Sequence, residues 1–183
     1  MPVFARAKLV IHDYCTIKIP GSPLPGKRYV TFHYVGPNPQ RIYPAIKKMM
    51  AEIFGADEKD VVESKFYWDR SAGKEEFSIS LDLIIDLDKF TFIHVSVDID
   101  GHAKPSEKFG KEGEVFLKIT GRLRTEYPQD TVWQRSIIYE YFRMFFHNLI
   151  YKSTRQKYLE MCVALMNRFY EELRKFLNIM ASG

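Results

Sequence analysis

Three stretches of the chain alternate apolar and polar residues with a period of two. Between residues 77 and 124 the apolar positions of each stretch fall on one parity and most polar positions on the other. Successive side chains of a β-strand point to opposite faces, so this pattern is typical of strands with one buried and one solvated face. Consecutive strands of this kind pair as an antiparallel meander. The parity that we expect to be buried comprises Leu81, Leu83, Ile85, Val95, Val97, Leu117, Ile119 and Leu123.

Shorter segments before the meander predict three more strands and one helix. Strands are expected over residues 4–19, 28–35 and 61–69, where apolar and β-branched residues recur at strand spacing. A helix is expected from Pro44, after a turn at 39–43, and Gly55 suits its end.

The segment between the last two strands of the meander, Gly101 to Gly113, carries three glycines and five charged side chains. A segment with so little to bury predicts a long and mobile connection.

The C-terminal region predicts a long helical segment. Thr131-x-x-Gln134 is a capping-box pattern that opens a helix, and Ser153-x-x-Gln156 is a second one. Either one helix of more than 40 residues or two abutting helices fits this region. Its apolar stripe is expected to pack on the apolar side of the sheet through Phe142, Phe145, Leu165, Phe169 and Leu173.

The predicted fold is therefore α+β, an antiparallel sheet of about six strands packed on a long C-terminal helix. This element order resembles the START-like helix-grip (SRPBCC-type) superfamily of hydrophobic-ligand-binding domains. The resemblance rests on element order and on no signature motif. It implies a small apolar ligand held between the sheet and the C-terminal helix.

Composition places the chain among globular proteins. It has 183 residues, 46% of them hydrophobic and 27% charged, which predicts a single domain over residues 1–183. Without a signal peptide or an uninterrupted apolar run, a cytoplasmic location is expected, with Cys15 and Cys162 as two buried thiols. Asn and Gln are scarce, four of each, which is a tendency of thermophile proteins.

Motifs for catalysis, metals and phosphates do not occur in the sequence. Asp98-Ile-Asp100-Gly101 resembles the start of a calcium loop, but Ala103 and Phe109 stand where the loop needs Gly and Glu. His12 and Cys15 point to opposite sides of a strand and cannot act together. No phosphate-binding, dinucleotide or nucleophile-elbow motif is found. We therefore expect no catalytic residue, metal site or cofactor.

Polar residues of the meander form the first candidate site. In adjacent strands, Asp82, His94, Asp98, Arg122 and Arg124 share one face of the sheet. This face is either a solvated outer surface with cross-strand charge pairs or a polar patch inside a ligand cavity. Because Ile84, Phe92 and Phe116 lie on the same parity, a second subunit or another partner is a further candidate cover for it.

Basic residues of the C-terminal region form the second candidate site. Residues 131–183 carry eight basic and four acidic side chains, whereas residues 1–130 are balanced at 19 of each. After pairing within the helix, Arg143, Lys152, Arg155 and Lys157 are expected to remain as an unpaired cluster.

Two functions follow from these patterns. The first is a non-catalytic domain that binds a small hydrophobic ligand. The alternative is an accessory protein of a protein or ribonucleoprotein complex that docks through the basic helical region. A homodimer fits either function. Catalysis of the kind found on similar folds would rest on fold analogy alone.

Overall fold

The computed structural model describes residues 10–21, 25–108, 110–127, 131 and 133–182. The strands are β1 (Val10–Tyr14), β2 (Tyr29–Pro37), β3 (Val62–Asp69), β4 (Glu75–Asp86), β5 (Thr91–Ser106) and β6 (Gly110–Glu126). The α-helices are α1 (Ile42–Phe54), α2 (Ile137–Phe145) and α3 (Lys152–Ser182), and a π-helical turn (Phe146–Tyr151) joins α2 to α3. Short 3₁₀ turns lie at Pro39–Arg41, Glu58–Asp60, Ser71–Gly73 and Trp133–Arg135.

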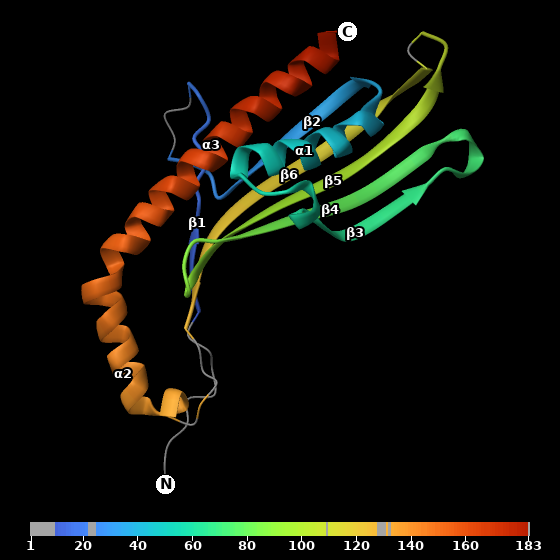
Figure 1. Cartoon of the computed structure of the whole chain (residues 1–183). Coiled ribbons are helices and arrows are strands. Elements are labelled where there is room, and N and C mark those ends of the chain that lie inside the picture. Colours follow the sequence, from blue (N-terminus) through green and yellow to red (C-terminus); the bar gives the residue numbers. More distant parts are fainter. Residues whose placement is uncertain (1–9, 22–24, 109, 128–130, 132, 183) are drawn as a thin grey trace.

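All six strands belong to one antiparallel sheet, as predicted. The path is β1-β6-β5-β4-β3, and β2 also pairs with β6. β1 lies along residues 122–126 of β6 and β2 along residues 112–120, so the two together form one edge of the sheet. The chain is thus an α+β protein in which the first and last strands are neighbours (Figure 1).

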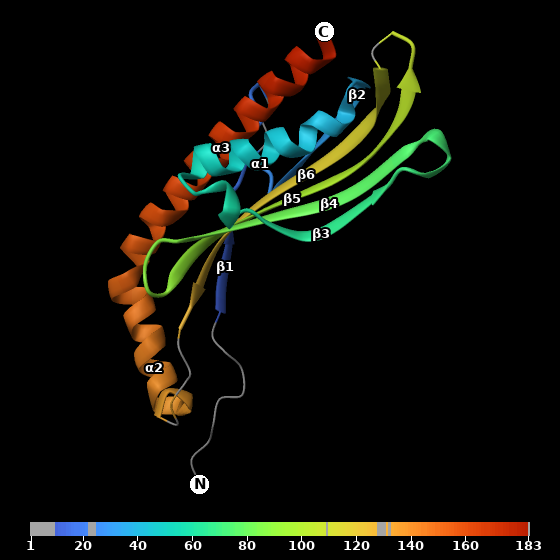
Figure 2. The ribbon, with the colours of Figure 1, turned by 45° about the vertical axis from the view of Figure 1, so that its right-hand side comes forward.

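Helices α1 and α3 cover the same face of the sheet (Figures 1 and 2). This is the apolar face predicted from the alternation, and the register sets Leu81 opposite Val97 and Leu83 opposite Val95. Seven of the eight residues predicted to be buried are buried, and Ile85 is half-buried. Gly121 of β6 allows close helix packing, because a Cβ there would come within 2.6 Å of the Met166 sulfur.

The long connection predicted from Gly101 to Gly113 is mostly strand, and its mobility stays a prediction. β5 and β6 continue through it, with Gly101 opposite Val115 and Ser106 opposite Gly110. Backbone pairing needs no apolar side chain, so the outer part of a hairpin can be charged on both faces and still form strands. Composition therefore suggested a loop where the sheet extends into solvent.

The prediction of two free thiols is wrong. Cys15 and Cys162 are both fully buried, but they form a disulfide with a Cα–Cα distance of 5.6 Å. Cys15 follows β1, where its N–H donates to the Gly121 carbonyl at 3.0 Å, and Cys162 lies within α3. The bond therefore ties the edge of the sheet to the long helix.

Near the N-terminus, the strand predicted over residues 4–19 ends earlier than predicted. Strand structure covers residues 10–14, with a single bridge from Ile17 to Lys27, and residues 1–9 lie outside the described part. The predicted turn at 39–43 corresponds to a 3₁₀ turn at Pro39–Arg41, after which α1 begins at Ile42. Gly55 ends α1 with a φ of 68°, which suits glycine.

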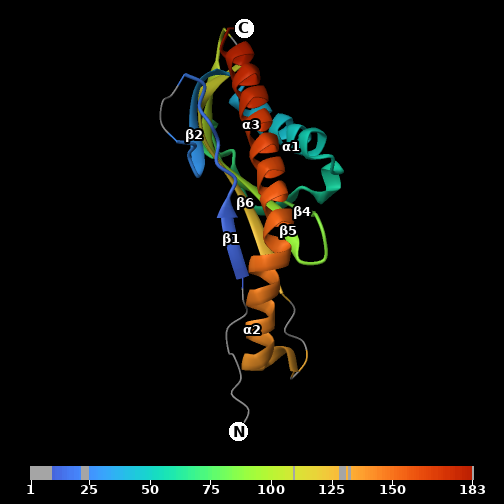
Figure 3. The ribbon, with the colours of Figure 1, turned by 90° about the vertical axis from the view of Figure 1, so that its left-hand side faces the viewer.

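The C-terminal region is one continuous helical segment that contains a π-helical turn, and α2 runs in a different direction from α3 (Figures 1 and 3). Phe169 and Leu173 of α3 are buried against the sheet, as predicted, and Leu165 is half-buried. Phe142 and Phe145 of α2 are 64% and 60% exposed, so their predicted packing on the sheet is wrong.

Candidate functional site

The predicted polar residues of the meander share the face opposite the helices. His94 Nε2 lies 2.9 Å from Asp82 Oδ1, and Ser80 Oγ donates to Asp98 Oδ1 at 2.8 Å. Burial alone would raise the pKa of Asp82, but hydrogen bonds from Ser64, His94 and Ser96 outweigh it and lower the pKa.

The two arginines predicted for this site lie on the same face of β6, with Arg122 opposite His94 and Arg124 opposite Phe92, and both contact aromatic rings. Arg122 stacks on Tyr14, whereas Arg124 lies over Phe92 and pairs with Glu126. On the same face, Ile84 is 57% exposed and Phe116 52%. This patch is a ladder of cross-strand contacts on an open surface, and no element in the described part of the chain covers it.

The predicted cluster of unpaired basic residues is divided by the fold. Arg143 is buried beside Tyr127 and Tyr139 and pairs with Glu140. Arg155 pairs with Asp13 and donates to Thr125 Oγ1 at 3.1 Å. Lys152 and Lys157 are exposed. The expectation of four unpaired charges is wrong because Arg143 pairs with Glu140 of the same helix and Arg155 pairs with Asp13 of β1.

A polar network that sequence reasoning missed joins the π turn to the end of the sheet. The Tyr151 hydroxyl lies 2.6 Å from both Asp88 Oδ2 and Thr91 Oγ1, and Thr91 contacts Thr125 at 2.9 Å. Burial and the Asp88 carboxylate raise the pKa of Tyr151 above its ordinary range. No motif marks this network, because its members come from three separate segments, with Thr91 34 residues from Thr125 and 60 from Tyr151.

His147 lies beside this network. Its Nδ1 is 2.8 Å from the Tyr127 hydroxyl. Burial, and then the Arg155 cation, lower the pKa of His147 below its ordinary 6.5. Burial also raises the pKa of Tyr127 to about 12. The pair is therefore neutral at neutral pH.

We expect stability to depend on the protonation of His147. Because its pKa is lower in the folded than in the unfolded state, its contribution is present above pH 6.5 and is lost as pH falls through 6.5 towards the folded pKa. Replacing His147 with Gln should flatten this part of the curve of unfolding free energy against pH. Urea unfolding at a series of pH values measures it, and equal slopes for both proteins would contradict the assignment.

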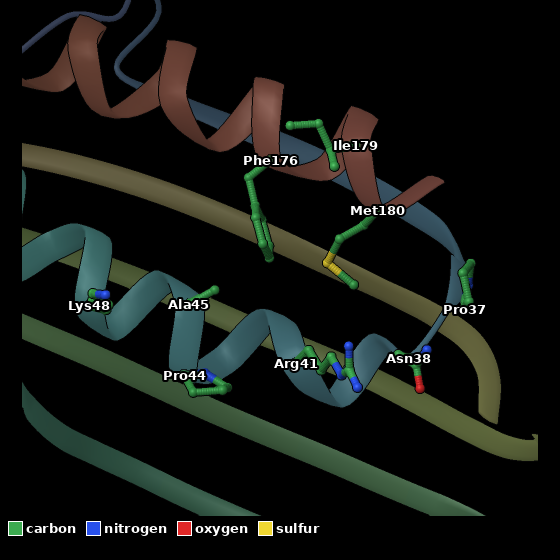
Figure 4. Close-up of a pocket in the computed structure, with 9 residues that line it drawn as sticks. All are labelled: Pro37, Asn38, Arg41, Pro44, Ala45, Lys48, Phe176, Ile179 and Met180. Carbon is green, nitrogen blue, oxygen red and sulfur yellow. The ribbon is translucent and has the colours of Figure 1, made fainter. Parts of the chain in front are cut away.

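A groove opens between α1 and the end of α3, and we call it the α1–α3 groove (Figure 4). Its volume is about 580 Å³, within the range of small-molecule sites. One wall comes from the turn and first half of α1 and the other from the last turns of α3. The lining residues are Pro37, Asn38, Arg41, Pro44, Ala45, Lys48, Phe176, Ile179 and Met180.

The groove combines an apolar lining with two cations. Phe176 and Met180 point from α3 towards α1, and Arg41 and Lys48 lie on the α1 side (Figure 4). Lys48 also makes a loose pair with Glu52 at 3.6 Å. Sequence reasoning missed this site because its two walls are more than 120 residues apart and no periodic pattern links them.

An apolar surface on the π turn and α2 is the other prominent feature. Ile137, Ile138, Tyr141, Phe142, Met144, Phe145, Leu149 and Ile150, which we call the α2 apolar face, have exposed fractions between 42% and 71%. A hollow of about 560 Å³ lies among five residues of this surface and Asn148.

The π turn explains the direction of this face. A π turn contains one residue more than an α-helical turn, so it rotates the preceding helix by about 100° relative to the following one. In an uninterrupted α-helix, Tyr141, Met144 and Asn148 would line up with the buried stripe of α3. With the π turn, Arg143 and His147 point inward instead, and the apolar side points outward.

Comparisons with known proteins do not assign a family. No family model and no curated protein matches the chain. Among solved structures, one titled delta-endotoxin matches with a TM-score of 0.32 and 10% identity, over 56% of this chain and 59% of that one. A protein of unknown function from Staphylococcus aureus matches with a TM-score of 0.27 and 11% identity, over 85% and 96% of the two chains. Both likenesses are too weak to support an argument about fold family or function.

No helix in the described ranges is long and apolar enough to cross a membrane. The same residues contain no group of three or more His, Cys, Asp or Glu side chains arranged to hold a metal ion.

Proposed function

We propose that this protein is a non-catalytic binding domain for a small amphipathic molecule with an apolar body and an acidic group. The α1–α3 groove is the observation that carries the proposal. Its apolar residues would contact the body of the ligand, and Arg41 and Lys48 are placed to pair with the acidic group.

The groove replaces the space between sheet and helix as the proposed ligand site. Met166, Phe169 and Leu173 are fully buried there and pack with the sheet residues as a closed core. The element order, with a long helix across an antiparallel sheet, supports the resemblance to START-like domains, whose ligands are hydrophobic. In the present chain the ligand would lie at the end of α3, beside α1.

The chemistry of the lining favours binding over catalysis. Among its nine residues there is no His, Cys, Asp, Glu, Ser or Tyr. Such a lining offers no hydroxyl, thiol, imidazole or carboxylate to act as a nucleophile or as a general acid or base. Arg41 and Lys48 can hold and orient an anion.

Binding of a fluorescent long-chain carboxylate, compared with the alcohol of equal length, tests the proposal. We expect the carboxylate to bind more tightly, and Ala45→Trp, which fills the groove, to weaken both by at least about tenfold. Arg41→Gln should weaken the carboxylate alone. Ala164→Trp, at an exposed position of α3 outside the groove, is the control. The proposal fails if neither probe binds and native mass spectrometry of detergent-free protein finds no retained ligand.

The second candidate is a role as an accessory protein, supported by the α2 apolar face and no longer by the basic cluster. The pairing of Arg143 with Glu140 and of Arg155 with Asp13 leaves Lys152 and Lys157 as the exposed members of the predicted basic cluster, which supports only weak and salt-sensitive attraction to RNA. The α2 apolar face favours a protein partner instead.

A further inference from the structure

The α2 apolar face is large enough for a stable protein interface. Eight large apolar side chains at exposed fractions between 42% and 71% present on the order of 1,000 Å², if a whole side chain has about 200 Å². The largest apolar patch on a typical monomer is about 300–600 Å². A standard interface buries about 800 Å² on each partner. The exposed apolar area of this face is therefore larger than the largest patch of a typical monomer. It is also as large as the area that one partner buries in a standard interface.

The outward direction of this face is built into the fold. The opposite side of α2 carries Arg143 and, in the π turn, His147, which contact Tyr127 at the end of the sheet. Arg143 is only 4% exposed and pairs with Glu140. Turning the apolar side inward would break these contacts and expose the core of the network. The contacts of Arg143 and His147 on the opposite side of the helix therefore keep the α2 apolar face pointing outward.

Charge decides what covers the face. Between residues 137 and 151 the only side chains with a fixed charge are Glu140 and Arg143, and Arg143 points inward. A helix that lies on an anionic membrane carries Lys and Arg along its polar side, at the level of the headgroups. The polar side of α2 faces the protein instead. An uncharged face also offers no pattern that would select an acidic or a basic partner.

A second copy of the same chain fits these observations. Two uncharged apolar ridges meet without repulsion, and a two-fold axis pairs the same patch on both subunits. The segment from residue 137 to 151 is about 22 Å long, enough for a helix pair of four turns. It lies at one end of the molecule, beyond most of the sheet, so the two sheets would not collide (Figure 3).

We propose that the protein forms a two-fold symmetric dimer in which the α2 apolar faces of two copies pack against each other. The interface leaves the α1–α3 groove free, because the groove lies at the opposite end of α3. The dimer and the proposed ligand site are therefore independent, and either can fail without the other.

Light scattering after size-exclusion chromatography tests the dimer. The wild-type protein should have twice the chain mass of 21.5 kDa at micromolar concentrations. Phe142→Glu/Phe145→Glu should raise the dissociation constant at least about a hundredfold, so that this variant elutes as a monomer. Ile84→Glu introduces a charge at an equally exposed site on the open sheet face and should remain dimeric.

Cross-linking locates the interface. Leu149→Cys adds a thiol on the α2 apolar face, and oxidation should join two chains through it. Circular dichroism of the Phe142→Glu/Phe145→Glu variant should match the wild type, because both side chains are exposed in the single chain. A wild-type protein that is monomeric at about 100 μM would overturn the proposal, and so would a dimer that the double variant leaves intact. Binding of a monomer to neutral phosphatidylcholine vesicles would also overturn it.

Discussion

Replacing both Cys15 and Cys162 with Ala should lower the free energy of unfolding by about 2–5 kcal/mol. The disulfide joins residues 147 positions apart, so it removes many conformations from the unfolded chain. It also joins the edge of the sheet to α3, two parts that must otherwise find each other across most of the chain. Urea unfolding followed by circular dichroism measures the difference.

The reduced wild-type protein provides the control for this experiment. A thiol reductant should lower the stability of the wild type towards that of the double variant, and it should leave the double variant unchanged. Before reduction, a thiol titration of the unfolded wild type should detect no free cysteine. A loss below about 1 kcal/mol would mean that the helix and the sheet edge stay together without the covalent bond.

Replacing Phe169 with Ala should cost about 3–5 kcal/mol, the usual range for a large aromatic side chain in a core. Phe169 is fully buried between α3 and the sheet, and its ring meets Phe54 of α1 edge to face at a centroid distance of 5.9 Å. Truncation leaves a cavity where α1, α3 and the sheet meet. The same unfolding experiment measures the effect.

Phe66→Ala is the matched control, because Phe66 is 54% exposed on the edge strand β3. It should cost less than about 1 kcal/mol. If the two variants lost similar amounts, α3 would not be packed on the sheet through Phe169, and the closed core would have to be revised.

The two proposals place binding at opposite ends of the long helix. The α1–α3 groove uses the last turns of α3, whereas the α2 apolar face lies before it. If both are correct, the dimer would carry two ligand sites far from its axis.

Prediction from the sequence was most accurate for the sheet and least accurate for the sites. The alternation between residues 77 and 124 predicted the strands, their pairing and the buried parity, because one side of a strand must be apolar when it covers a core. It also placed Asp82 and His94 on one face, and they are in contact. It could not show that this face is open.

The errors have two physical origins. The apolar stripes of α2 and α3 were treated as one, although 27 residues, or about 7.5 turns of a regular α-helix, separate Phe142 from Phe169 and place them on opposite sides. In the folded chain the inward positions before α3 belong to Arg143 and His147. The count of charges along the helix left out the i,i+3 pair of Glu140 and Arg143, and no such count could show that Asp13 of β1 holds Arg155.

Local periodicity therefore determined the fold class, the strand faces and the buried stripe of α3, because these depend on side-chain direction along a single element. The tertiary structure decided the rest. The Cys15–Cys162 bond, the Tyr151–Asp88 contact and the α1–α3 groove each join segments that are distant in the chain. Their partners are set by how the elements pack, and no spacing within one segment encodes that packing.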